Sequence, residues 1–576
     1  MEQFGNRTLP KLQRYLYLPH LFSRRERITV SIAGAIALIA GMLFLSRVYL
    51  RMTHPVPAVG GEYTEGLLRE PRTINPIFFS TNDTDRDLAR LMYAGLIKYD
   101  SAGTPVPDLA ERIESSEDGR HWTVTLRPDL TWQDGETLNA DDVLFTIKTI
   151  QNSDFKSPLR TNWQGVEAKK TGSLTIDFEL RAGYGPFIEN LGVGIIPEHL
   201  WKDVTPEQAP LHELNLQPVG AGPYRFDNIE LRKDGSIESY SVRRNKRYHH
   251  GEPLLQRINF SFFRTEEELM SAWRRGTIDG VGSVPETVAV AVNSKLVTRR
   301  DLKTPRIFGL YFHTRNAPAL ADESVRRAIA HAVNREAIAE HAPAGGAIPT
   351  DTFLPAPFFD RTSNESFSHP YDVLRARTLL DEAGWNDDRD GIREKRTGSG
   401  KNATTTALKF RIATSEWPDL VRAAGLTAEM LADVGIGIEI DRYPVSDLET
   451  QVIRPRAYEI LLFGQVYGRE PDPFPFWHSS QLRDPGLNVA QFSHKTADRV
   501  LEEIRKTTDH ALRDKAFQSL QGVFEKELPA IFLFTQLYIY LLPAHIQGVE
   551  LEAIALPADR FNDVHRWYIH TKRAFR

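Results

Sequence analysis

The chain has 576 residues, a formal net charge of −5 and no cysteine. Without cysteine it forms no disulfide or thiolate metal site and has no cysteine nucleophile. The charge is unevenly distributed, because residues 1–51 carry +6 and the remainder carries −11. An acidic body of this kind argues against nucleic-acid binding.

The first predicted element is a hydrophobic helix at residues 28–46, which contain no charged side chain. At about 1.5 Å per residue it spans roughly 28 Å, close to the ~30 Å hydrocarbon core of a bilayer. Six of the eight basic residues before position 52 precede this run. The positive-inside rule therefore predicts a cytoplasmic basic tail at 1–27, a transmembrane helix at 28–46 and an extracytoplasmic body.

A cleaved signal peptide is the alternative interpretation of this segment. Its small-x-small motif, Ala35-Ile-Ala37, lies in the middle of the apolar run, and Arg47 and Tyr49 fit a cleavage site poorly. The absence of cysteine excludes the lipid-modified cysteine of many exported proteins. We therefore favour an uncleaved anchor, followed by a proline-containing stalk at residues 47–60.

Beyond the stalk, predicted helices and strands alternate. Leu88, Leu91 and Met92 share one face of a helix that Asn82 or Thr84 can cap. Alternating apolar residues predict strands at 122–126, 174–180 and 436–440, and apolar stripes predict helices at 139–150, 325–333 and 374–383. This mixture indicates an α/β protein with several sheets.

Short motifs are spread in order over nearly the whole body. They are PRTINP (71–76), MYAGLI (92–97), PDLAE (107–111), DGRHWTVTLR (118–127), WQDG (132–135), NADDV (139–143), GAGPY (220–224), RNKRY (244–248), GTID (276–279), VRRAI (325–329), NR (334–335), LLDEAGW (379–385) and PDP (471–473). Through these motifs the region 61–576 resembles the large extracytoplasmic solute-binding proteins of ABC importers, of the oligopeptide, dipeptide and nickel-binding type (family 5).

The resemblance implies an α/β fold of the two-lobed periplasmic-binding-protein type (type II, large form with an inserted subdomain). The apolar run at 28–46 adds one transmembrane helix before it. The implied borders are 61–100, 215–305 and 544–576 for lobe I, 101–214 for its inserted subdomain, and 306–543 for lobe II. Two rigid lobes joined by hinge strands let a ligand close the cleft by contacting both faces.

The predicted ligand site centres on the loop GQVYGREPDP (464–473), which follows an apolar strand at 458–463. In peptide-binding relatives this loop commonly presents an aspartate that pairs with the ligand's α-amino group. Counting back from Glu470 places Tyr467 at that position, whereas counting from the strand places Val466 there. Neither is acidic, which weakens the expectation of ordinary amine capture.

Arg469 is a candidate for bidentate binding of a carboxylate or another anion. The alternative, a solvated loop arginine, is slightly favoured. Further side chains predicted to line the cleft are Phe78, Asn82, Tyr224, Trp417, Gln465 and Tyr467, with Trp477 nearby. Phe78 and Trp417 are equally compatible with core positions.

The sequence contains no recognisable motif for catalysis or for metal binding. It contains no P-loop, HExxH, G-x-S-x-G or dinucleotide motif. Adjacent histidines at 249 and 250 would point in different directions on a strand, and we expect them to be exposed loop residues. Residues 386–397 begin like a calcium loop, but Thr397 replaces the closing acidic residue, which favours a turn into a hairpin. We therefore predict no catalytic residue, no bound metal and no cofactor.

Three function classes follow. The favoured one is a membrane-anchored receptor that binds a peptide-like or other polar solute and delivers it to an ABC permease and ATPase. A ligand sensor with the same fold, or a receptor for an anion, metal chelate or saccharide, is the alternative. An extracytoplasmic enzyme would need a cleft nucleophile or an acid–base pair that the sequence does not indicate.

Overall fold

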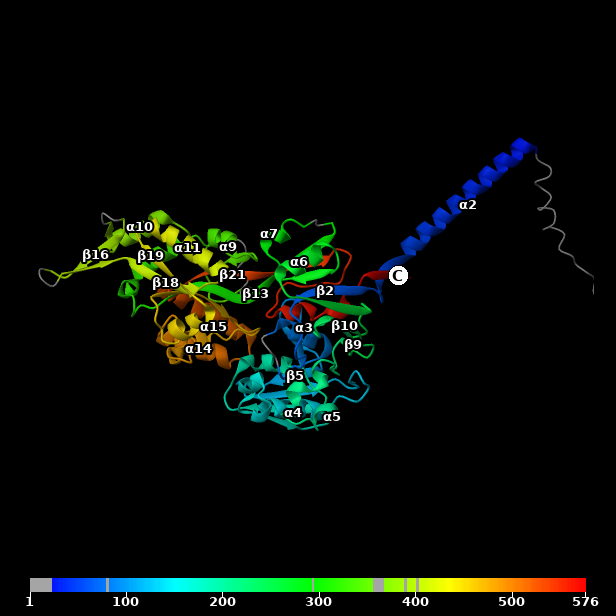
Figure 1. Cartoon of the computed structure of the whole chain (residues 1–576), viewed down its shortest axis with the longest axis horizontal. Coiled ribbons are helices and arrows are strands. Elements are labelled where there is room, and N and C mark those ends of the chain that lie inside the picture. Colours follow the sequence, from blue (N-terminus) through cyan, green and yellow to red (C-terminus); the bar gives the residue numbers. More distant parts are fainter. Residues whose placement is uncertain are drawn as a thin grey trace, which may run out of the picture. The chain divides into compact units, whose positions relative to one another are not determined.

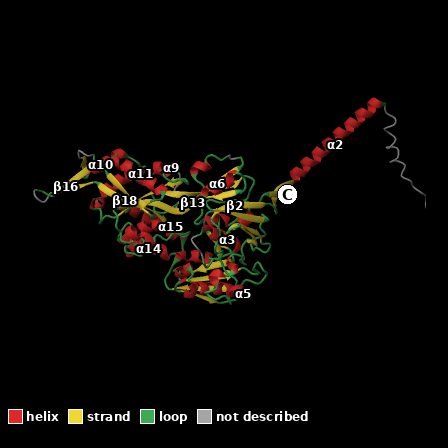
Figure 2. Cartoon of the chain, in the orientation of Figure 1, coloured by secondary structure: helices red, strands yellow, loops and turns green. Residues whose placement is uncertain are grey.

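The structure is a computed structural model that describes residues 23–78, 82–292, 295–355, 367–387, 391–399 and 403–575. Its chain divides into two compact units, Met1–Val59 with His570–Arg576, and Gly60–Ile569. Figure 1 shows the course of the chain, and Figure 2 shows its helices and strands.

The first unit is built on helix α2, Arg24–Met52. Ser23 caps its start, because the Ser23 hydroxyl accepts from the backbone N–H of Glu26 while the Glu26 carboxylate accepts from that of Ser23. Large apolar side chains are exposed along the helix. By length and composition, α2 is the one described helix able to cross a membrane. It contains the whole predicted span 28–46.

Strand β1, Thr53–Ala58, follows α2 directly and pairs antiparallel with the C-terminal strand β22, His570–Phe575. The Arg573 guanidinium donates to Thr53 Oγ1 at 2.8 Å and to the backbone oxygen of Leu50 at 3.0 Å. The segment 47–60, which we predict from the sequence to be a proline-containing stalk, is helical to residue 52 and a strand from 53 to 58. The reason is that the C-terminus supplies a pairing partner.

The second unit is organised by an eleven-stranded mixed sheet. Its order is β19-β18-β20-β13-β21-β12-β2-β11-β10-β9, with β14 also paired to β21. The strands are β2 Glu62–Leu68, β9 Tyr224–Leu231, β10 Ile237–Arg244, β11 Arg257–Phe263, β12 Gly280–Gly282, β13 Val297–Phe312, β14 Ala347–Pro349, β18 Lys409–Ser415, β19 Gly437–Tyr443, β20 Ile460–Val466 and β21 Ala530–Pro543.

The antiparallel pair β13 and β21 runs through both halves of this sheet. Its register shifts between Lys303 and Ile307. Leu302 and Tyr540 belong to one hydrophobic core, whereas Phe308 and Phe534 belong to another. We therefore define lobe I as residues 60–304 and 537–569, and lobe II as residues 305–536. The return crossing lies inside β21, before the expected border at 543.

Lobe I and its inserted subdomain share one continuous core, so Trp132 and Tyr63 belong to the same cluster. The subdomain carries a four-stranded antiparallel sheet in the order β5-β6-β8-β7. The remaining elements of lobe I are α3 Asp83–Met92, β3 Ile97–Tyr99, β4 Pro105–Pro107, β5 Ala110–Ser115, β6 His121–Leu126, α4 Ala140–Gln151, β7 Val166–Lys170, β8 Thr175–Leu180, α5 Glu198–Trp201, α6 Glu266–Arg274 and α7 Glu286–Ala289. The predicted strands at 122–126 and 174–180 and the helix at 139–150 are confirmed, each within one or two residues at its ends.

Lobe II surrounds its half of the sheet with helices (Figure 2). They are α8 Glu323–Ala332, α9 Arg335–His341, α10 Val373–Glu382, α11 Pro418–Ala432, α12 Val445–Asp447, α13 Phe474–Trp477, α14 Lys495–Lys506 and α15 His510–Glu527. A small sheet is formed by β15 Asn386–Asp387, β16 Arg393–Thr397 and β17 Thr404–Ala407. The antiparallel pairing of β15 with β16 confirms the hairpin predicted there; part of its turn, 388–390, lies outside the described residues.

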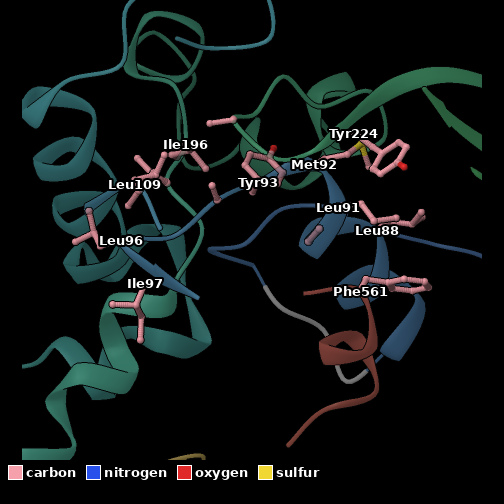
Figure 3. Packing of buried hydrophobic residues seen from close by; sticks show 14 of the residues in the cluster. Leu88, Leu91, Met92, Tyr93, Leu96, Ile97, Leu109, Ile196, Tyr224 and Phe561 are labelled. Carbon is pink, nitrogen blue, oxygen red and sulfur yellow. The ribbon is translucent and has the colours of Figure 1, made fainter. Parts of the chain in front are cut away.

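Three of the sequence motifs meet in lobe I around Gln133. Its side-chain Nε2 lies 3.2 Å from the carbonyl oxygens of Met92 and Gly222 and 2.7 Å from that of Tyr224, while its Oε1 accepts from the Gly220 N–H. A Cβ on Gly220 would lie 2.0 Å from the Met92 oxygen. Glycine is therefore required where these segments touch, beside the core residues of Figure 3.

We expect Gln133→Met to lower the free energy of unfolding by about 2–3 kcal/mol, because it keeps the length of the side chain but leaves buried backbone groups unpaired. Urea denaturation measures the change. The control is Gln164→Met at an exposed position, which we expect to change stability by less than about 0.5 kcal/mol. Equal effects of both substitutions would contradict this role of Gln133.

Candidate functional site

A cavity of about 560 Å³ lies where the two lobes meet. Both lobes and both crossing strands contribute side chains to its wall. Among the lining residues are Leu68, Arg69, Asn82, Asp83, Asp87, Glu266, Leu556 and Arg560 from lobe I, Thr304 and Gln536 from the crossings, and Arg306, Trp417 and Val466 from lobe II. Its size suits a small polar ligand.

The N-terminus of α3 forms one wall. Asn82 caps this helix, since its Oδ1 accepts from the Thr84 N–H at 3.3 Å and its Nδ2 donates to the Glu70 carbonyl at 3.0 Å. Before it, Arg69 adopts a positive φ of 69°, a conformation that non-glycine residues rarely take. The Thr84 hydroxyl donates to the Arg69 carbonyl at 3.0 Å and holds this turn at the cavity.

A buried charge network lies behind this wall. Arg560 donates to both oxygens of Asp87, at 2.9 and 2.7 Å, and to Glu65 at 3.1 Å. The Tyr540 hydroxyl donates to the other Glu65 oxygen at 2.8 Å. Burial raises the pKa of Asp87 to about 6, and the Glu65 carboxylate adds to this effect while Arg560 opposes it. One guanidinium thus serves two carboxylates beside the cavity.

The opposite wall carries side chains that remain accessible. Arg306 lies on β13 directly after the crossing and is exposed, with its Nη1 3.4 Å from Gln536 Oε1. Among the described residues, no carboxylate forms an ion pair with Arg306 or Arg69. Trp417, before α11, is 36% exposed and its ring lies 5.7 Å from that of Phe308. The Arg306 guanidinium on this wall and the Arg69 guanidinium on the lobe I wall are therefore both available to a ligand.

Arg469 occupies a different position from the one predicted. Its guanidinium pairs with Asp559 of lobe I and lies 4.4 Å from the ring centroid of Tyr99, and its N–H donates to Glu189 at 3.0 Å. It is neither a solvated loop arginine nor a lining residue of the 560 Å³ cavity, because lobe I and its subdomain enclose it. The side chain joins the lobes.

The other predicted residues divide between the cavity and the cores. Asn82 and Trp417 line the cavity, as does Val466, which is half exposed at the end of β20. Tyr224 is fully buried and its hydroxyl donates to the Leu255 carbonyl at 3.3 Å. The remaining predicted residues do not line the cavity: Phe78 stacks on Phe155, Gln465 is buried, and Tyr467 accepts from Trp477 Nε1 within the lobe II core.

The expectation that His249 and His250 are exposed is wrong. Their side chains are 10% and 20% exposed, and the Nε2 atoms lie 2.7 and 2.9 Å from one oxygen of Asp108. The loop after β10 folds against the end of β4, so both rings turn toward the same carboxylate. Sequence spacing gave no indication of this contact, because Asp108 is far away in the chain.

A two-lobed α/β protein with a polar cavity between its lobes has the architecture of a solute-binding protein. Residues 104–485 match the family model described as bacterial extracellular solute-binding proteins, family 5 (Middle), and the chain belongs to this family.

The chain is 24% identical over 533 residues to the oligopeptide-binding protein AppA of Bacillus subtilis, covering 89% of this chain and 92% of AppA. The structure of that AppA with a nonapeptide matches with a TM-score of 0.63 at 22% identity, covering 89% of this chain and all of the other. The structure of NikZ from Campylobacter jejuni with Ni(L-His) matches with a TM-score of 0.65 at 22% identity, covering 88% and 99%. These structures support the two-lobed fold.

We expect Arg469→Gln to favour separation of the lobes, because it leaves the buried Asp559 without this partner; breaking such a pair costs about 3 kcal/mol. Small-angle scattering of the ligand-free protein should then give a larger radius of gyration. Arg454→Gln is the matched control, since Arg454 pairs with Glu449 on the exposed surface of lobe II alone. Identical scattering of both variants would show that Arg469 does not hold the lobes together.

Proposed function

We propose that the chain is a membrane-anchored receptor that binds a short peptide-like solute in the interlobe cavity and delivers it to an ABC importer. The observation that carries this proposal is the 560 Å³ cavity, whose walls come from both lobes and bear charges of both signs. A ligand that contacts both walls favours the closed arrangement, which a permease can recognise.

The charges suit a zwitterionic ligand. Arg69 and Arg306 are exposed guanidinium groups in the cavity, while Asp83 and Glu266 are exposed carboxylates there. A short peptide at neutral pH has an ammonium group at one end and a carboxylate at the other. Arg306 is our candidate for the ligand carboxylate, since a guanidinium can bind it through two hydrogen bonds.

The amine end of the ligand requires a different partner from the aspartate expected in peptide-binding relatives. The cavity position at the end of β20 belongs to Val466, whose side chain cannot bind an ammonium group. Asp83 and Glu266 lie on the lobe I side and are the candidates instead. Two relatives bear on the ligand class: a nonapeptide is bound in one structure and Ni(L-His) in another. Both ligands contain amino-acid carboxylates.

Helix α2 supports the membrane anchor. The helix has the length and composition to cross a bilayer, its apolar side chains are exposed, and six of the eight basic residues in 1–51 precede its apolar segment 28–46. The alternative is a leader peptide that is removed. Retention of the chain in the membrane fraction after an alkaline carbonate wash supports the anchor, whereas release of a protein that starts beyond residue 46 contradicts it.

The ligand assignment is tested on the full chain in detergent. Native mass spectrometry first identifies solutes that copurify. Calorimetry then compares trialanine with its C-terminal amide, and we expect the amide to bind about 10- to 100-fold more weakly, because one charge-assisted contact is lost. In Arg306→Gln this difference should shrink to a few-fold, and the control Arg454→Gln should retain it.

A single non-peptide solute in the purified protein, together with no binding of either peptide, would contradict the peptide assignment. Binding of trialanine with the same amide penalty in Arg306→Gln would keep the peptide assignment and move the carboxylate to another residue, with Arg69 the next to substitute.

A further inference from the structure

A histidine cluster lies in lobe I, away from the interlobe cavity. Asp108 follows β4, and His249 and His250 follow β10. Their ligand atoms all lie within 4.8 Å of one another, and none of the three residues lines the 560 Å³ cavity. The Asp108 side chain is 7% exposed, so the site is enclosed yet open to solvent through His250.

A third histidine borders this cluster. His565 is buried, and its Nδ1 has no hydrogen-bond partner in the part of the chain that the structure describes. Its ring centroid lies 6.1 Å from that of His250 and 5.4 Å from that of Tyr248. A buried imidazole nitrogen without a partner is unfavourable, and a bound ion or an ordered water would satisfy it.

We propose that Asp108, His249 and His250 bind a divalent transition-metal ion such as Zn²⁺, with His565 available for the fourth position. Two imidazoles and one carboxylate form a common ligand set for such ions. Tetrahedral ligands at about 2.0–2.1 Å from a metal lie roughly 3.3 Å apart. The present separations of 2.7 and 2.9 Å between the imidazole nitrogens and Asp108 need to widen by about half an ångström.

The neighbouring cations Lys98 and Arg127 do not bond to the Asp108 carboxylate, which can therefore bind the ion. The positive charge of Lys98 lies near both His250 and His565, but its ammonium group pairs with Asp563 at 2.8 Å. Arg127 approaches Asp108 as well, but its Nε donates to the backbone oxygen at 2.7 Å and not to the carboxylate. A bound cation would therefore replace the two hydrogen bonds that the imidazoles now make to one oxygen.

The ion would join segments that are distant in the chain. Asp108 belongs to the inserted subdomain, the two adjacent histidines belong to the β10–β11 connection, and His565 belongs to the short helix Val564–Arg566. Because an ion that binds only the folded state stabilises it, Zn²⁺ at a hundredfold excess over its Kd lowers the unfolded-to-folded ratio about 100-fold.

The test uses the full chain in detergent, without a histidine tag and stripped with a chelator. We expect calorimetry with Zn²⁺ to give one equivalent of binding and thermal melting to shift upward. The variant His249→Ala/His250→Ala should lose both effects. The control is His199→Ala, which removes a surface histidine that pairs with Asp134 at 2.8 Å; it should keep both effects.

Zn²⁺ binding that persists unchanged in His249→Ala/His250→Ala would place the metal elsewhere, including the interlobe cavity, and overturn the proposal. Absence of stoichiometric binding to the wild-type chain would overturn it as well. Melting in chelator shows whether the double variant is folded. If it is not, Co²⁺ loaded into the wild-type chain provides the second test: X-ray absorption must show two imidazole ligands, or three where His565 fills the fourth position, and fewer than two imidazoles contradicts the assignment.

Discussion

The pairing of β13 with β21 is the constraint on which the two-lobed arrangement depends. These long antiparallel strands belong to both halves of the central sheet, and their register shifts where the hydrophobic cores of the lobes separate. Apolar packing fixes the strands on either side, so bending is easiest at the shift. Thr304 and Gln536 line the cavity at this same point. A small change of backbone angle there moves the walls that a solute would contact.

The lobes are also joined by a second, non-covalent contact. Arg469 extends from lobe II to Asp559, while Glu189 of the inserted subdomain accepts the Arg469 N–H. The loop fits closely, because a Cβ on Gly468 would lie 2.5 Å from a Glu189 carboxylate oxygen. The inserted subdomain thus supplies a surface against which lobe II rests. In the proposed open–closed cycle, bending of these strands and rupture of the Arg469 contact would together set the free-energy difference between the two states.

Features that depend on residues close together in the sequence could be predicted, whereas features that depend on contacts between distant residues could not. Helices and strands with clear periodicity were predictable, and so was the two-lobed α/β fold class, because the motifs occur in a recognisable order. Asn82 was identifiable as a helix cap. Tyr467 and Trp477 were expected in the cleft because aromatic residues suit both cores and ligand sites, and their mutual hydrogen bond lies within the lobe II core.

The residues that sequence analysis missed owe their roles to distant partners. Asp87 and Arg560 meet across most of the chain, and neither lies in a distinctive motif. Arg306 had a local indication, since it directly follows Pro305 and stands at the point where β13 changes from a polar to an apolar sequence. For His249 and His250, the predicted loop position beyond the end of β10 is correct, but their predicted exposure is wrong because the distant Asp108 packs against both rings.

For a chain anchored through α2, as proposed above, the pairing of β1 with β22 also bears on how the remainder would be released from a membrane. A protease that cuts once between residues 59 and 61 would leave the fragment bearing α2 and β1 paired with β22 over six residue pairs, and β22 would still be joined to residues 61–569 through the chain. A short two-stranded ribbon is only marginally stable, so dissociation would follow, but as a separate step. Cleavage and release would then be distinct events, and the pairing of the strands would set the delay between them.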